Sequence, residues 1–241
     1  MVHLVPRGNG NPAVRAVLVV GLLGAISACG GAPGQPDATF ATASPPAPAA
    51  SIAAPPSATS IVLGSADIGR QLSAGAYQVG DPFAAPFTIT LPDGMELGSL
   101  VEGDVSFKHE SDWVIVEVFE NLFADPCHAD GPVDPPIRPT VDAIVTGLSQ
   151  MVGFKVGKVS DVVLGRHSGK SFELTNTVDT STAGCSRGLM LPLWTYRGGI
   201  EASTNGGLRE QLWVIDVDGI AVIVARGGPG IDPVAASIEF E

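Results

Sequence analysis

The sequence Gln211-Leu-Trp-Val-Ile-Asp-Val217 is followed by Asp218-Gly219 and then by Ile220-Ala-Val-Ile-Val-Ala225. Both apolar runs are rich in β-branched residues, which favour strands. Asp-Gly suits the positive φ angles that a type I′ turn requires, and such a turn joins two antiparallel strands tightly. The sequence therefore predicts an antiparallel hairpin near its carboxyl end.

Shorter apolar runs, bounded by Gly, Pro or Asp, precede this hairpin and predict further strands. In the strongest of them, Asp112–Phe119, three odd-numbered residues alternate with three valines, so that both faces of the strand are expected to be largely covered. The odd-numbered residues are Trp113, Ile115 and Glu117. The remaining predicted strands are Ala76–Val79, Phe87–Leu91, Met95–Leu100, Val105–His109, Lys155–Leu164, Ser171–Thr175 and Met190–Tyr196.

One helix is well indicated after Pro139-Thr140, where the threonine can cap its first turn. Apolar residues follow at helical spacing and form one stripe: Val141, Ile144, Val145, Leu148 and Met151. A short helix from about Asp232 and a strand over Ser237–Phe240 are expected to end the chain. This order of elements predicts an α+β fold with a mainly antiparallel sheet and packed helices.

The first 28 residues have the layout of a signal peptide. Arg7 and Arg15 precede an uncharged run of about ten residues over 16–25, which is shorter than the roughly 20 residues that a transmembrane helix needs. The following Ile26-Ser27-Ala28-Cys29 resembles the bacterial lipobox, and this resemblance implies a diacylglyceryl thioether on Cys29. The other interpretation is a secretory signal that is followed by an incidental cysteine.

Residues 29–61 are expected to form the lipidated cysteine and a linker. From residue 30 to residue 60 the chain holds seven prolines and ten alanines, with Asp37 as its only charge. Proline fixes φ and favours extended polyproline conformations, so this segment is typical of a spacer. A ligand for an aromatic groove is the alternative, but no Arg or Lys flanks the prolines. Residues 62–241 then form a single globular domain, large enough to fold without metals.

The net charge excludes some partners. Without the two arginines of the signal region, 11 basic residues face 25 acidic ones, a net charge of −14. Such a chain is repelled by phosphate backbones and by anionic lipid headgroups. We therefore expect no nucleic-acid function, and a membrane contact through the lipid anchor only.

A family resemblance rests on four features of residues 62–241. These are Leu72-Ser-Ala-Gly-Ala-Tyr77, Phe87-Thr-Ile-Thr-Leu-Pro-Asp-Gly94, the two cysteines in mid-domain, and the Leu212–Gly219 hairpin segment. They resemble a group of uncharacterised secreted bacterial lipoproteins. The resemblance implies the α/β/α sandwich of the photosystem extrinsic protein PsbP, and it carries over no catalytic residue. Met95 stands where that family usually has a tryptophan after Pro-Asp-Gly.

Three cysteines leave Cys127 and Cys185 once Cys29 is lipidated, and an even number in an exported domain predicts one disulfide. A bond that closes so long a loop contributes roughly 4 kcal/mol to stability. We expect a purely structural role. The alternative is a reactive thiol or metal pair, but neither cysteine lies in a Cys-x-x-Cys motif or beside a basic cluster.

Other candidate sites have plainer explanations. Gly165-Arg-His-Ser-Gly-Lys-Ser171 has the residue types of a phosphate loop with one residue too few, and we interpret it as a hairpin turn. His167 beside Ser168 does not make a catalytic pair by adjacency alone. Carboxylates and an imidazole that could bind a metal occur in a Pro-rich acidic loop, at Asp125, His128, Asp130 and Asp134. The three tryptophans, Trp113, Trp194 and Trp213, are expected in the core rather than on a ligand platform.

These patterns predict the location of the protein better than its activity. We expect a membrane-anchored extracytoplasmic lipoprotein without a cofactor, a bound metal or a catalytic residue, whose domain binds an envelope protein or a small ligand. The alternative is a hydrolase or transferase that acts on envelope material, with Asp, Glu or His side chains brought together only by folding.

Overall fold

The computed structural model describes residues 60–128, 131–178, 184–185, 191–203, 209–228 and 232–241. The predicted signal peptide, Cys29 and most of the predicted linker lie outside the described residues. Ile61, which the sequence analysis assigned to the end of the linker, is the first residue of a strand.

The described elements are mostly strands. In chain order they are β1 (Ile61–Leu63), the 3-10 helix η1 (Ser65–Asp67), β2 (Gln71–Leu72), β3 (Gly75–Val79), β4 (Phe87–Leu91), β5 (Met95–Val101), β6 (Asp104–His109), β7 (Asp112–Leu122), α1 (Val141–Gln150), β8 (Phe154–Val156), β9 (Ser160–Leu164), β10 (His167–Asn176), β11 (Leu191–Tyr196), β12 (Gly199–Ser203), β13 (Arg209–Val217), β14 (Ile220–Gly227), α2 (Asp232–Ala236) and β15 (Glu239–Phe240).

The strands form two sheets. The larger sheet has the order β2-β5-β6-β7-β14-β13-β10-β8, with β9 beside β10 and with β11 and β12 joined to it through β7. The smaller sheet has the order β1-β3-β4-β15, and β1 runs parallel to β3. The other pairings are antiparallel in both sheets. The prediction of a mainly antiparallel, sheet-rich fold is therefore confirmed, with less helix than expected.

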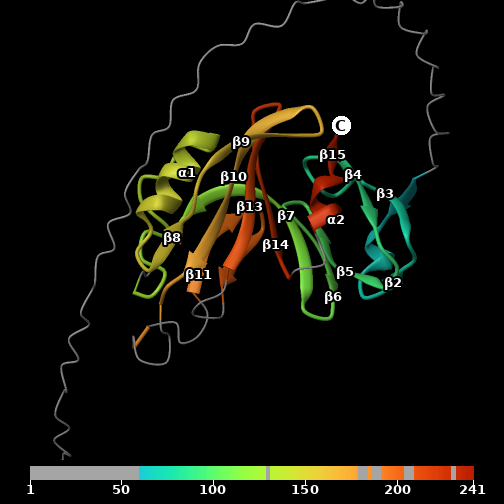
Figure 1. Cartoon of the computed structure of the whole chain (residues 1–241), viewed down its shortest axis with the longest axis horizontal. Helices are drawn as coiled ribbons and strands as arrows, with labels where there is room; N and C mark the ends of the chain where they lie inside the picture. Colours follow the sequence, from blue (N-terminus) through green and yellow to red (C-terminus); the bar gives the residue numbers. More distant parts are fainter. Residues whose placement is uncertain (1–59, 129–130, 179–183, 186–190, 204–208, 229–231) are drawn as a thin grey trace, which may run out of the picture. The chain divides into compact units, whose positions relative to one another are not determined.

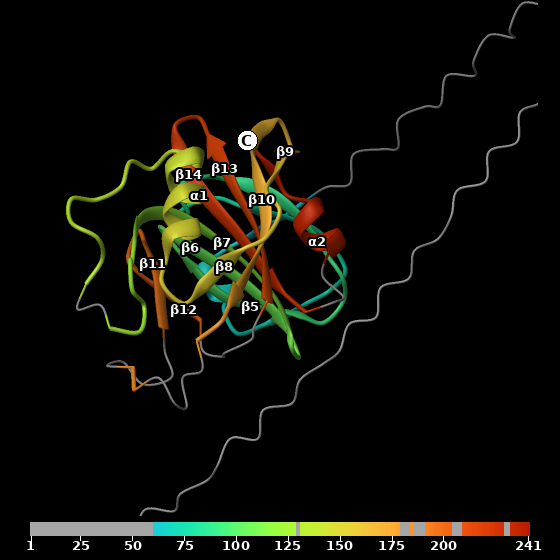
Figure 2. The same cartoon turned by 60° about the vertical axis from the view of Figure 1, so that its left-hand side comes forward.

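Each face of the larger sheet carries its own core. On one face, residues of the smaller sheet and α2 pack against β5, β6, β7 and β14. On the other face, α1 packs through Ile144 and Leu148 against β7, β10 and β13. Figure 1 shows α1 beside β8 and α2 beside β4, and Figure 2 shows the same elements after a 60° turn.

Helix α1 forms where its sequence pattern predicts. Thr140 has extended backbone angles, and its hydroxyl accepts a hydrogen bond from the amide of Ala143. Gly147 faces Leu122 so closely that an added Cβ would lie 2.4 Å from the Leu122 Cδ1 atom. A glycine at this helical position therefore lets α1 approach the end of β7.

The β13–β14 hairpin also forms as predicted. Asp218 and Gly219 both have positive φ, at 52° and 88°. The carboxylate of Asp216 accepts a hydrogen bond from the Gly219 amide at 2.7 Å, which stabilises the turn. Val217 pairs with Ile220 directly across it.

The other predicted strands are present, with several differences at their ends. The segment Lys155–Leu164 contains two strands, β8 and β9, rather than one. Both pair with β10 along the same edge. Gly165 and Arg166 form the turn between β9 and β10, which confirms the hairpin interpretation of the phosphate-loop-like sequence. Strands β1, β2 and β12 were not predicted, and each has five residues or fewer.

Candidate functional site: a disulfide beside an Asp–His pair

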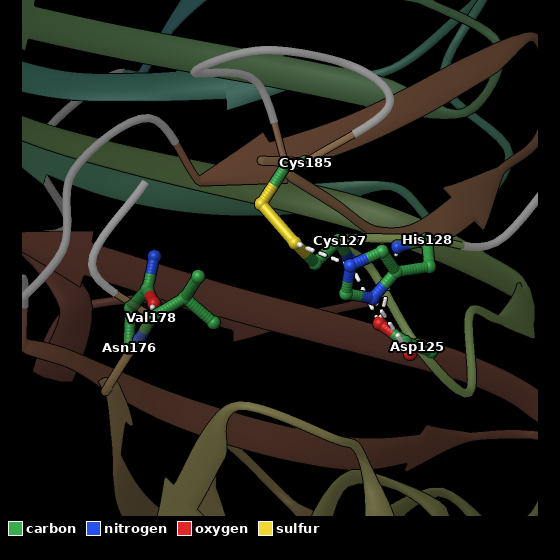
Figure 3. Close-up of a disulfide and its surroundings, with 6 residues drawn as sticks. All are labelled: Asp125, Cys127, His128, Asn176, Val178 and Cys185. Carbon is green, nitrogen blue, oxygen red and sulfur yellow. Dashed lines mark hydrogen bonds and ion pairs between the residues drawn. A yellow bond between two sulfur atoms is a disulfide. The ribbon is translucent and has the colours of Figure 1, made fainter. Parts of the chain in front are cut away.

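Cys127 and Cys185 form a disulfide that links two connecting segments (Figure 3). Cys127 lies between β7 and α1, and Cys185 lies between β10 and β11. The two residues are 58 positions apart in the sequence, and their Cα atoms are 4.6 Å apart. This is the disulfide pair that the sequence predicts.

The two halves of this disulfide differ in exposure. Cys127 is buried, with 4% of its surface exposed. Cys185 is half-buried. Figure 3 shows that Cys185 lies on the side of the bond away from the ring of His128. Cys185 is therefore the more exposed residue of the pair.

Asp125 organises the backbone around Cys127. Its Oδ1 atom accepts hydrogen bonds from the amides of Cys127 and His128, both at 3.1 Å. Its Oδ2 atom lies 3.1 Å from Nδ1 of His128. A short acidic side chain that turns the chain in this way is common in loops, because it replaces backbone partners.

The imidazole of His128 therefore lies between a carboxylate and a sulfur. Because an ionised carboxylate only accepts hydrogen bonds, Nδ1 is the donor to Asp125. The other ring nitrogen, Nε2, lies 3.6 Å from Sγ of Cys127. The His128 side chain is 60% exposed and that of Asp125 is 33% exposed, so the ring can exchange protons with water. A carboxylate that orients an imidazole is the arrangement used to hold or move a proton.

The described residues bring together only two of the candidate metal ligands from the acidic loop. Asp125 and His128 come together, Asp134 is exposed, and Asp130 lies outside the described residues. Across the described part of the chain, no three His, Cys, Asp or Glu side chains converge closely enough to hold a metal ion.

A second polar group is buried on the α1 face of the larger sheet. Glu117 of β7 has no exposed surface, and its Oε2 atom accepts a hydrogen bond from the indole of Trp194 at 2.6 Å. Asp104 lies directly opposite Glu117 on β6. Glu201 of β12 also forms a hydrogen bond with Glu117. Carboxyl groups from two other strands thus act on Glu117, which is hydrogen-bonded to the tryptophan.

Burial raises the pKa values of the ionisable side chains in this group. It raises the pKa of Glu117 well above its ordinary value of 4.5, and the nearby Glu201 raises it further. Burial likewise raises the pKa of Asp104, although a hydrogen bond from Ser99 acts against this change. Burial, followed by repulsion from these carboxylates, raises the pKa of Tyr196 to about 12. Trp194 is fully buried as well, and its hydrogen bond with Glu117 joins β11 to β7 inside the domain.

Glu210 of β13 is a separate buried carboxyl group. It is 6% exposed, and loss of hydration raises its pKa from 4.5 to about 7. It lies opposite Leu174 of β10, on the face that also carries Leu212.

The structure also places the other predicted candidates. His167 is buried, with Phe240 edge-on to its ring at 6.0 Å, whereas Ser168 is exposed. Trp194 is fully buried, and Trp113 and Trp213 are partly buried against the cores, as expected.

Sequence reasoning missed two of these arrangements. His128 directly follows Cys127, and this adjacency was a signal that a single basic side chain could reach the sulfur. Glu117 lies within the apolar run of β7, which was a signal of a buried carboxyl group. Its partner Trp194 is 77 positions away, and no local pattern indicates that contact.

No protein-family model matches the sequence, and no curated protein matches it either. In the described part of the chain, no helix combines the length and the apolar character needed to cross a membrane.

Proposed function

We propose that this chain is a lipoprotein that is anchored outside the cytoplasmic membrane through Cys29 and acts as a non-enzymatic binding module. The observation that carries the proposal is the Cys127–Cys185 disulfide, because such bonds persist in oxidising compartments. It accounts for two of the three cysteines in the sequence. The third cysteine, Cys29, ends the lipobox-like Ile26-Ser27-Ala28-Cys29.

Two acyl chains on Cys29 would give stable anchoring. Each buried methylene contributes about 0.8 kcal/mol, and one chain alone binds a membrane only marginally. The Pro- and Ala-rich linker would then separate the domain from the bilayer. Extended at about 3.1 Å per residue, its 31 residues reach roughly 95 Å.

The partner that we propose is an envelope protein or a small ligand. A hollow of about 470 Å³ between the end of β4 and α2 supports a small ligand, since small-molecule sites measure about 300–1,000 Å³. Its lining is mostly apolar and includes Leu91, Pro92 and Val234.

A hydrolase or transferase that acts on envelope material is the second candidate function. The observation in its favour is His128, whose imidazole is oriented by Asp125 as in a general base. Its other ring nitrogen, Nε2, faces the disulfide sulfur of Cys127 rather than a serine hydroxyl, which favours the binding module.

The finer description of the fold that we propose is a PsbP-like α/β/α sandwich. Its support is the position of α1 on one face of the larger sheet and of α2, with the smaller sheet, on the other.

The experiment that tests the anchor is replacement of Cys29 by serine in the full chain. The variant should lose metabolic labelling by a fatty acid and move to the soluble fraction. The Cys127→Ala, Cys185→Ala double variant is the matched control, because it keeps Cys29 and should remain labelled. Labelling that persists in the Cys29→Ser variant would rule out the anchor.

A further inference from the structure

We propose that the Cys127–Cys185 bond is a thiol–disulfide exchange site, at which an external thiol attacks Cys185 and His128 stabilises the departing Cys127 thiolate. This inference goes beyond the proposed function, and it replaces the purely structural role that we expected from the sequence. The class of reactant is a thiol or dithiol, either small or on a protein.

Access decides which sulfur is attacked. Exchange requires a thiolate to approach one sulfur from the side opposite the other sulfur. Cys185 is half-buried, whereas Cys127 is 4% exposed and lies against the ring of His128. The Cys185 sulfur is therefore the one that an external thiolate reaches, and Cys127 is the leaving group.

The departing sulfur has a partner already in place. Exchange becomes faster as the leaving thiol becomes more acidic, and a neighbouring imidazolium stabilises a thiolate. Nε2 of His128 lies 3.6 Å from Sγ of Cys127. Asp125 holds the ring in place through Nδ1. A protonated ring in this position would present Nε2–H to the thiolate as it forms.

The step is balanced. The incoming thiolate forms a new bond to Sγ of Cys185, and the electron pair of the broken bond remains on Sγ of Cys127. The products are a mixed disulfide at Cys185 and a Cys127 thiolate, with no net oxidation. A second thiolate can then attack the reagent's sulfur in the mixed disulfide and release Cys185, which reduces both cysteines and oxidises the reagent to its disulfide.

Opening the bond would free the segment before α1 from the connection between β10 and β11. The two cysteines close a loop of 58 positions that contains α1 and β8 to β10. The link between these two segments would thus depend on the ratio of thiols to disulfides outside the membrane.

The test is the rate at which dithiothreitol reduces the folded chain, followed by alkylation and intact mass. His128→Asn should slow reduction by about tenfold, because the leaving thiolate loses the imidazole that lies beside it. Asp125→Asn should slow it in the same direction. The matched control is His109→Asn, an exposed histidine at the end of β6, which should reduce at the wild-type rate.

A second measurement identifies the sulfur that is attacked. With 2-mercaptoethanol as the probe and a rapid acid quench, peptide mass mapping should find the mixed disulfide on Cys185. Equal rates for the wild type and His128→Asn, or a mixed disulfide mainly on Cys127, would overturn the proposal. If His128→Asn does not fold, the site of the mixed disulfide in the wild type still decides.

Discussion

The two faces of the larger sheet differ in what they bury. The face covered by the smaller sheet and α2 buries a continuous apolar cluster that includes Phe87 and Phe107. The face covered by α1 also has an apolar cluster, but strand alternation places most of the buried polar side chains there. These are Asp104, Glu117, Asn176 and Glu210, whereas the buried His167 lies on the opposite face beside Phe240.

The two faces therefore differ in how strongly their contribution to the stability of the domain depends on pH. Buried apolar side chains stabilise the fold to the same extent at any pH, because they do not ionise. A buried carboxyl group is stable in the neutral form and becomes costly once it ionises. Because the buried carboxyl groups lie on the face covered by α1, pH can act on stability through that face.

The largest expected effect is in the apolar face. Replacing Phe107, which has no exposed surface, by alanine should lower the free energy of unfolding by about 3–5 kcal/mol through lost burial and a cavity. Urea unfolding at two pH values measures this loss. The loss should be the same at both pH values, and a strong pH dependence would remove the distinction between the faces.

Its matched control is Val101→Ala on neighbouring β5. Val101 is 45% exposed, so its truncation should change stability by no more than about 0.5 kcal/mol.

A smaller, pH-dependent effect is expected at Glu210. Its neutral form favours folding below the ordinary pKa of 4.5, and this contribution is lost as the pH rises through about 7. The Glu210→Gln variant stays neutral, so at pH 8 it should be more stable than the wild type by up to about 3 kcal/mol. At pH 4 the two proteins should unfold at nearly the same urea concentration.

Glu120→Gln is the control for this pH profile, because Glu120 is an exposed glutamate of β7. Its profile should parallel that of the wild type. A constant difference between Glu210→Gln and the wild type from pH 4 to pH 8 would show that Glu210 does not ionise in this range.

The smallest effect is expected at an exposed ion pair. Arg197, in the turn between β11 and β12, lies 3.1 Å from Glu102, and both side chains are largely exposed. Glu102→Gln should therefore cost no more than about 1 kcal/mol, since water and ions screen such pairs. The cost should vanish in about 1 M salt, and a loss that persists there would point to packing instead.

Local patterns were sufficient to predict much of this fold. The Asp218-Gly219 turn and the Thr140 cap each depend on neighbours within a few residues, and both formed as expected. The order of strands in the sheet could not be read from the sequence, because the pairing of β7 with β14 joins segments about a hundred positions apart. Strand β2 has two residues, too few for any periodicity.

Only part of the candidate site could be predicted from the sequence. Cysteine counting identified Cys127 and Cys185 as partners, since it needs no geometry. The position of His128 depends on how Asp125 turns the backbone, and this turn is visible only in three dimensions. The same holds for Glu117, whose partners come from three other strands.

The most direct test of the central proposal is the intact mass of the protein extracted from its own membrane without reductant. A lipid-anchored, disulfide-bonded chain should have a mass that begins at Cys29, carries the added diacylglyceryl group and contains no free thiol. A mass that still includes Met1, or a chain from Cys29 without lipid, would contradict the anchor.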